Sequence, residues 1–190
     1  MMIRQIRYGL MPLAACALLL LTGCAQSGQV SQIGAAPSAA PDSPTASPSQ
    51  DPTQAATTQI LAVYTGMRQA QVSAEDSGTT QNVSLSDYAA GKALIAITSD
   101  VGEDAAKDWR MAGLPQLNPK VTALDLSSRP PTATVTDCMN VSGWHMVDQV
   151  TGKDITAPSA QSSFVSVSQA QLGQDGWRIT ETEVNRSKPC

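Results

Sequence analysis

The chain has 190 residues, of which 12 are basic and 16 acidic, giving a formal net charge of −4. This acidic balance, without a cluster of Lys or Arg, excludes the electrostatic footprint of a nucleic-acid-binding protein, so we expect no nucleic-acid partner. The length is enough for one domain of ordinary size and a tether.

Residues 1–23 predict a bacterial lipoprotein signal peptide. Arg4 and Arg7 give a positively charged start, and residues 10–21 form an uncharged apolar run. That run is too short for a membrane-spanning helix, which needs about 20 residues. The run ends in Leu-Thr-Gly-Cys at positions 21–24, the pattern of a lipobox. We therefore expect Cys24 to carry diacylglycerol and a fatty acid such as palmitate after cleavage, which anchors the protein to the extracytoplasmic face of the cell membrane.

Residues 24–57 predict a lipidated cysteine followed by a disordered tether. The segment is rich in Ala, Ser, Pro, Gln and Thr, and it has no aromatic residue, Lys or Arg. Such a composition buries too little apolar surface to offset the entropy of ordering. Removal of the signal peptide leaves ten basic and sixteen acidic residues, a net charge of −6. Acyl chains rather than charge are thus expected to hold the protein at the membrane.

The four cysteines resolve into one expected disulfide. Cys16 leaves with the signal peptide and Cys24 is used by the lipid, so Cys138 and Cys190 remain. Two thiols in an oxidising compartment predict a structural disulfide bond. The alternative of a redox-active pair lacks the C-x-x-C spacing that such pairs usually show.

Helices are expected in the first half of a globular domain that covers residues 58–190. Apolar residues at i, i+3, i+4 and i+7 predict an amphipathic helix over 58–73. Ser84 and Asp87 have the spacing of a capping box for a second helix. Its expected inner face carries Leu85, Tyr88, Ala89 and Ile95. Residues 102–112 predict a third, shorter helix that contains Trp109.

After position 119 the pattern changes to that of antiparallel strands. Strands are expected over 120–127, 132–139, from Trp144 onward, over 161–172 and over 177–186. Ala133, Val135 and Met139 alternate with polar residues, and Trp177 and Ile179 are expected to face inward. The sequence therefore predicts an α+β fold with two or three N-terminal helices packed on a curved antiparallel sheet of four to five strands.

Three short stretches carry a resemblance to a known family. Val135 to Cys138, Gly143 to Asp148 and Gly176 to Thr180, together with the order of elements, resemble a family of secreted Gram-positive lipoproteins. Those proteins are similar in fold to nuclear transport factor 2. The resemblance implies a cone-like domain over 58–190 in which the terminal cysteine pairs with the one that follows Thr-Asp. It implies no single function, because this fold carries isomerases, dehydratases, cyclases and binding modules alike.

Few residues of the sequence are candidates for catalysis or metal binding. His145 is the only histidine, and it alternates with Trp144 and Met146. If those two face the core, His145 faces solvent. Asp137 shares a strand face with Val135 and is expected to point inward, where a buried carboxylate can act as a general base. A metal site is not expected, because there is no second histidine and no spare cysteine.

Aromatic residues complete the set of pocket candidates. Tyr64 and Tyr88 lie on the apolar faces of two predicted helices, where each could offer a hydroxyl to a ligand or simply belong to the core. Trp144 is a further candidate for the pocket wall and is otherwise a core anchor. The chain has no nucleophile, phosphate-loop or zinc-protease motif, so we expect neither an enzyme nor a cofactor.

Three functions follow as hypotheses. The first is a membrane-anchored, non-catalytic domain that binds a small apolar ligand or another envelope protein. The second is a small isomerase, dehydratase or cyclase that uses Asp137 or His145 with a tyrosine. The third is a structural accessory of an envelope complex. An open interior in which Asp137 and a tyrosine converge favours a ligand or an enzyme, whereas an interior filled by side chains favours protein interaction.

Overall fold

A computed structural model of the protein describes residues 51–158, 160–185 and 189–190. The chain divides into Met1–Ala46 and Ser47–Cys190, and all described residues belong to the second unit. The predicted signal peptide, Cys24 and residues 25–50 of the predicted tether lie outside the described residues.

In the described residues three helices precede six strands, which confirms the predicted α+β class. The helices are α1 (Pro52–Ser77), α2 (Leu85–Tyr88) and α3 (Gly91–Ala105). The strands are β1 (Trp109–Gly113), β2 (Pro119–Asp125), β3 (Thr132–Asn140), β4 (Trp144–Asp148), β5 (Ser163–Gly173) and β6 (Gly176–Asn185).

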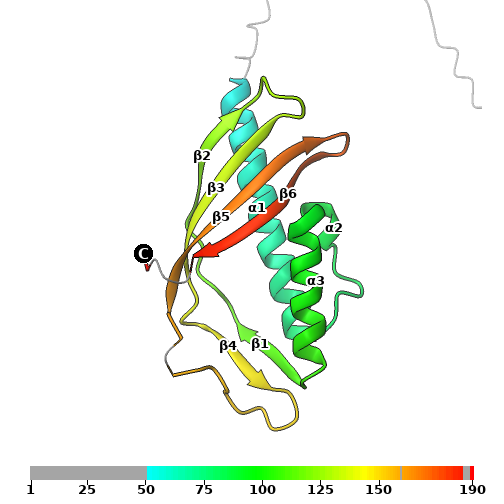
Figure 1. Ribbon diagram of the computed structural model, residues 1–190, viewed down its shortest axis with the longest axis vertical. Helices are drawn as coiled ribbons and strands as arrows, with labels where there is room; N and C mark the ends of the chain where they lie inside the picture. Colours follow the sequence, from blue (N-terminus) through cyan, green and yellow to red (C-terminus); the bar gives the residue numbers. More distant parts are fainter. Residues whose placement is uncertain (1–50, 159, 186–188) are drawn as a thin grey trace, which may run out of the picture. The chain divides into compact units, whose positions relative to one another are not determined.

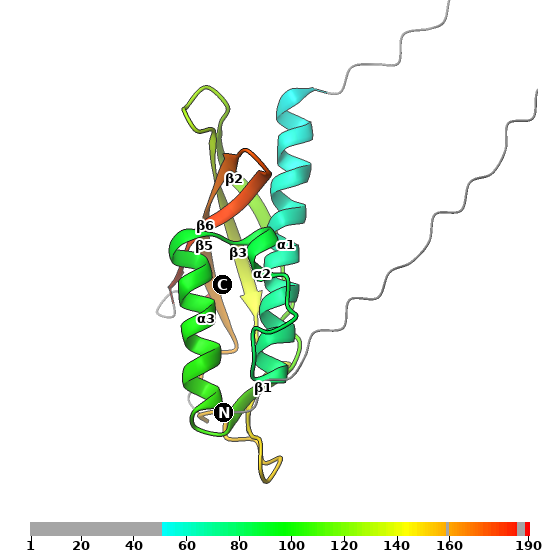
Figure 2. The same cartoon turned by 90° about the vertical axis from the view of Figure 1, so that its right-hand side faces the viewer.

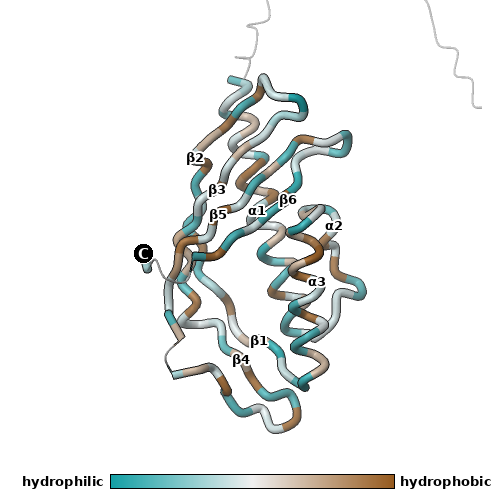
Figure 3. Tube along the Cα trace, viewed as in Figure 1, coloured by the Kyte–Doolittle hydropathy of each residue, from teal (hydrophilic) through white to brown (hydrophobic). Residues whose placement is uncertain are grey.

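The strands form two antiparallel sheets rather than one. The larger sheet has the order β2-β3-β5-β6, and β1 pairs with β4 in a separate two-stranded sheet. Helices α1 and α3 lie on the same side of the larger sheet, and α1 continues past its edge to the smaller one (Figures 1 and 2). The turn that joins β5 to β6 is hydrophilic, and the turn that joins β2 to β3 is mostly so (Figure 3).

Helix α1 is longer than the sequence predicts. Asp51 caps its start by accepting a hydrogen bond from the Thr53 amide at 2.8 Å, and Pro52 occupies a first-turn position that needs no amide donor. The helix ends at Gly78, whose φ of 66° gives the left-handed cap. The expected tether therefore stops before residue 51, because Asp-Pro at 51–52 is a helix-start signal within its polar composition.

The second and third predicted helices are corrected by the structure. Ser84 makes no side-chain capping hydrogen bond, and the helix after it has only four residues. Helix α3 ends at Ala105, and Asp108 has a left-handed φ of 57°. Trp109 therefore begins a strand instead of lying in a helix.

Ile95 is another incorrect assignment. Its exposed fraction is 70%, whereas Ala93, Ile97 and Val101 form the buried face of α3. The predicted inner face assumed one helix running from Leu85 to Ile95. Because the chain is extended at Ala89 and Ala90, α3 starts with a new rotational phase, which places Ile95 on the outside.

Alternation in the larger sheet is confirmed. Ala133, Val135, Asp137 and Met139 are buried along β3, whereas the residues between them are partly exposed. The inner face packs on the helices and builds the core. Its largest fully buried apolar side chains are those of Tyr64, Ile60, Met67, Met139, Ile179 and Val135.

Strand β4 departs from its predicted alternation. Val147 is its buried residue, and Trp144, His145 and Met146 are each partly buried. The prediction treated β4 as part of one large sheet with Trp144 and Met146 inward. Because β4 pairs with β1 and with the loop at Asp154 but with no strand of the larger sheet, it does not have one face on the core and one in solvent. None of the helices in the described residues is both long and apolar enough to cross a membrane.

Candidate functional site

A stripe of four buried polar residues follows one face of α1. Tyr64, Arg68, Gln71 and Glu75 are spaced by four, three and four positions, which places them one above another along the helix. Their exposed fractions are 0%, 5%, 9% and 8%. We call these four residues the polar stripe. Burial of so many polar groups is costly unless each finds a partner.

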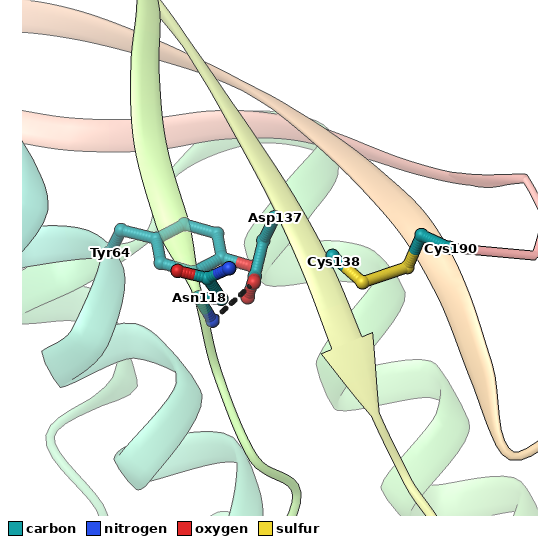
Figure 4. The surroundings of a disulfide bond; sticks show 5 residues. All are labelled: Tyr64, Asn118, Asp137, Cys138 and Cys190. Atoms are coloured by element: carbon teal, nitrogen blue, oxygen red, sulfur yellow. Dashed lines mark hydrogen bonds between the residues drawn. A yellow bond between two sulfur atoms is a disulfide. The ribbon is translucent and has the colours of Figure 1, made fainter.

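The first end of the polar stripe is anchored on the larger sheet by Asp137. The Tyr64 hydroxyl donates to Asp137 Oδ2 at 2.8 Å, and the backbone N–H of Asn118 donates to Oδ1 at 2.7 Å. In Figure 4, Asp137 points toward Tyr64 while the next residue, Cys138, points the other way. Burial raises the pKa of Tyr64 to about 12, so its hydroxyl keeps its proton.

Arg68 is the centre of the network. Its Nε donates to the Tyr64 hydroxyl at 3.1 Å, Nη1 to Gln71 Oε1 at 2.8 Å and Nη2 to Ser166 Oγ at 2.8 Å. The guanidinium carbon also lies 5.2 Å from the centroid of the Tyr64 ring. No direct salt bridge to Arg68 occurs within the described residues. Tyr64 instead bridges the buried cation and the carboxylate of Asp137.

Glu75 is the second end of the polar stripe. Gln71 Nε2 donates to Glu75 Oε1 at 2.8 Å. Burial raises the pKa of Glu75 to about 7, and the negative charges of Asp100 and Asp104 on α3 act in the same direction. The hydrogen bond from Gln71 and the charge of Arg68 only partly oppose this rise. Glu75 therefore titrates near neutral pH.

The network joins α1 to the sheet, and it leaves little freedom for chemistry. Asp137 and Tyr64 converge, as an acid–base pair would, but both are 0% exposed. Both carboxylate oxygens of Asp137 already accept hydrogen bonds. A general base must reach the proton of a substrate, and here the position is filled by protein.

The other candidate residues lie apart from this network. His145 is at the surface, with its side chain 44% exposed and Nδ1 3.5 Å from Asp154 Oδ2. Trp144 is partly buried, and its Nε1 is buried without a partner among the described residues. Tyr88 is partly buried, packs against the hydrophobic core and lies beside Gly66 on α1.

Concave surface is found on the outer side of α1. Hollows of about 260 and 550 Å³ lie between α1 and Tyr88, and one of about 340 Å³ lies between α1 and residues 114–117. Gln69 lines all three hollows. We call the part of α1 from Leu61 to Ser73 that borders them the outer face of α1.

The predicted disulfide is confirmed. Cys138 and Cys190 are bonded, with their Cα atoms 5.8 Å apart. The bond lies on the side of β3 opposite Asp137 (Figure 4). It therefore fixes the C-terminus to the face of the sheet that the helices do not cover.

Arg68, Gln71, Glu75 and Ser166 were not among the residues singled out from the sequence. A signal for three of them was present, because polar residues at 68, 71 and 75 continue the helical stripe that begins at Tyr64. Ser166 gave no such signal, since its role depends on the pairing of β5 with β3. Within the described ranges, no group of three or more His, Cys, Asp or Glu residues is placed to hold a metal ion.

Comparison with known proteins gives a likeness of fold. No family model matches the chain, and no curated protein matches it. Among solved structures, it is similar to the intermembrane-space region of the chloroplast protein ARC6, with a TM-score of 0.51 and 16% identity. The match covers 73% of this chain and 99% of the ARC6 region. At this identity the likeness shows a shared α+β fold alone.

Proposed function

We propose that the protein is a membrane-anchored extracytoplasmic lipoprotein whose globular domain binds another envelope protein without catalysis. The observation that carries the proposal is the filled interior. Tyr64 and Asp137 hydrogen-bond to each other with no exposed surface, so the acid–base pair that an isomerase or dehydratase would need is used structurally.

The compartment in this proposal is supported by the disulfide and by the signal-peptide pattern. A bond between Cys138 and Cys190 is typical of proteins outside the reducing cytoplasm. Lipidation of Cys24 rests on the lipobox in the sequence. The resemblance to Gram-positive lipoproteins adds the same expectation.

The binding surface in this proposal is the outer face of α1. From Pro52 to Glu75 the helix contains two charged residues, Arg68 and Glu75, and both are buried. The exposed side over this length consists of Thr, Gln, Ser, Pro and Ala. Depletion of charge is the compositional signal of the core of a protein interface.

The occupant that fits this surface is an uncharged segment of an envelope protein with apolar and amide side chains. Half-buried Leu61 and Val72 line hollows on the two sides of Gln69 and offer apolar contact. A protein with a net charge of −6 in its mature form repels acidic partners, but it does so least at the outer face of α1, whose one charged residue, Arg68, is buried where it lines a hollow. A small apolar ligand in the same hollows is the alternative occupant.

Photo-crosslinking of the full-length protein in its own host tests the surface. A photoreactive residue at Gln69 is expected to capture one defined envelope protein. The same residue at Gln171, an exposed position on β5, is the matched control and should capture none. Equal capture at both positions, or none at Gln69, would contradict the proposed surface.

Direct binding then tests the function. With the purified partner, Gln69→Arg should weaken the affinity at least about tenfold, since one charge is placed in an uncharged contact, and Gln171→Arg should not. Native mass spectrometry that finds a bound small molecule instead would favour the ligand. Cys24→Ala should leave an unprocessed precursor, and unchanged acylation would refute the lipobox assignment.

A further inference from the structure

Strand β2 forms an edge of the larger sheet. It is the first strand in the order β2-β3-β5-β6, with β3 on one side and no strand on the other (Figure 1). Apart from its ladder with β3, no backbone–backbone hydrogen bond joins residues 119–125 to another described residue. The outer side of β2 therefore presents unpaired N–H and C=O groups, which can pair with a strand of another chain.

The opposite edge of the sheet, β6, is protected from such pairing. Ala89 pairs with Ile179, and the Ala90 N–H donates to the Ile179 carbonyl at 2.8 Å, so the segment before α3 covers this part of the edge. Further along β6, Glu181 and Glu183 share one face. Two copies of this edge would bring like charges opposite each other, which is unfavourable. Pairing between copies is thus favoured at β2.

A β-bulge gives β2 a self-complementary order of side chains. Lys120 and Asp125 are separated by five positions and would lie on opposite faces of a regular strand. Because the register with β3 shifts at Thr122, both lie opposite residues of β3 that alternate with the buried ones, and both are exposed. Val121 and Leu124, by contrast, pack against the hydrophobic core from the inner face.

An antiparallel pair of β2 strands about a two-fold axis satisfies this order. An axis at the bulge places Lys120 opposite Asp125 of the second copy and Val121 opposite its Leu124. Each of these contacts occurs twice by symmetry, and in each the two side chains share a face of the sheet. A shift by one residue would place charged side chains opposite apolar ones, so the pattern selects one register.

Both charges can take part in such a pair. Within the described residues, neither Lys120 nor Asp125 forms a salt bridge. Asp125 accepts hydrogen bonds from Ser127 and Ser128 through Oδ1. Its other carboxylate oxygen is therefore the one expected to meet the ammonium group of the second copy.

We propose that β2 pairs antiparallel with β2 of a second copy of this chain, which joins two four-stranded sheets into one continuous sheet. The paired segment is residues 120–125, which is much shorter than the roughly 20–30 residues that each partner contributes to a stable complex. The pair is therefore expected to be weak and in exchange. It uses the edge of the sheet rather than the outer face of α1, so it is independent of the function proposed above.

Photo-crosslinking of the full-length protein in its own host tests the pair. Two copies with different tags are co-expressed, and a photoreactive residue replaces Ala123, which is exposed beside the expected axis. The expected product joins position 123 of one copy to residues 121–124 of the copy with the other tag, as mapped by mass spectrometry. Absence of a product between the two copies, or a product formed only with a different protein, would overturn the proposal.

Reversal of charge tests the register. Lys120→Glu places like charges opposite each other twice and should lower the yield of the product at least about fivefold. Lys153→Glu makes the same change of charge at an exposed position outside β2 and should leave the yield unchanged. Lys120→Glu combined with Asp125→Lys restores opposite charges and should return the yield to within about twofold of the wild type.

The comparison of the two single variants decides the proposal even if the double variant does not accumulate. Equal yields for Lys120→Glu and Lys153→Glu would overturn the proposed register. A folded double variant that does not recover the product would overturn it as well.

Discussion

At the scale of the residue, the main feature is that two potential catalytic groups, Tyr64 and Asp137, are used as structural partners of each other in the core. Tyr64 donates to Asp137 and accepts from Arg68, so one hydroxyl serves two buried charged groups. A buried group that loses its partner costs about 1–3 kcal/mol, which is more than a typical net hydrogen bond contributes. The hydroxyl of Tyr64 should therefore account for a large part of what this residue contributes to the free energy of unfolding.

Tyr64→Phe should lower the free energy of unfolding by about 2 kcal/mol, because Asp137 and Arg68 each lose a partner inside the core. Urea denaturation followed by tryptophan fluorescence measures the change. Tyr88→Phe is the control, since it deletes the same atom from a hydroxyl that makes no hydrogen bond to another described residue. Equal losses in the two variants would show that the network adds nothing.

At the scale of the element, α1 organises the domain. One side of it carries core residues and the polar stripe, and another side accepts the ring of Tyr88 directly on Gly66. A Cβ at position 66 would overlap Cε1 of that ring. The absence of a side chain at Gly66 thus sets how closely α2 approaches α1.

Gly66→Ala should destabilise the protein by about 1 kcal/mol or more, because displacement of Tyr88 outweighs the gain of about 1 kcal/mol in helix propensity. Gly102→Ala on α3 is the matched control. Its added Cβ meets nothing within 4 Å, so it should stabilise by about 0.5–1 kcal/mol.

Thermal unfolding of the two alanine variants gives the comparison. A third variant combines Gly66→Ala with Tyr88→Ala. It should be no less stable than Tyr88→Ala alone, because the ring that the added Cβ would displace is gone. Persistence of the Gly66→Ala penalty without the Tyr88 ring would contradict the proposed contact.

At the scale of the whole molecule, the disulfide closes the C-terminal half of the domain. It joins positions separated by 52 residues, and the closed loop contains β4, β5 and β6. A cross-link of this length stabilises chiefly by restricting the unfolded chain, by about 4 kcal/mol.

Replacement of both Cys138 and Cys190 by Ser should therefore lower the free energy of unfolding by about 4 kcal/mol, measured by urea denaturation. The wild-type protein under full reduction should match the double variant within about 1 kcal/mol, which excludes an effect of the serine side chains themselves. A loss below about 1 kcal/mol would mean that the unfolded chain is restricted in another way.

The local patterns that could be read from the sequence are those fixed by the periodicity of the backbone. Alternation along β3 placed Asp137 inward together with Ala133 and Val135, and alternation along β6 placed Trp177 and Ile179 in the core. Counting cysteines gave the disulfide between Cys138 and Cys190. The first of these features depends on the period of two in a strand, and the second on the number of cysteines left after the predicted signal peptide and lipid are assigned. Neither needs knowledge of which segments pack together.

The features that sequence reasoning missed all depend on a partner distant in the chain. Trp109 lies in a strand because β4 pairs with it, and Ile95 is exposed because a break at Ala89 and Ala90 resets the helix. The burial of Arg68 requires Ser166, which is 98 positions away. Local propensity cannot encode such contacts, since tertiary packing overrides it.

The sequence by itself thus determined the α+β class, the inward position of Asp137 and the disulfide. Only the tertiary structure decided what Asp137 and Tyr64 do. Their hydroxyl–carboxylate contact across 73 positions removes both groups from solvent and links them to Arg68. The physical reason is that periodicity tells which face a side chain occupies, whereas only packing tells whether water or protein fills the space in front of it.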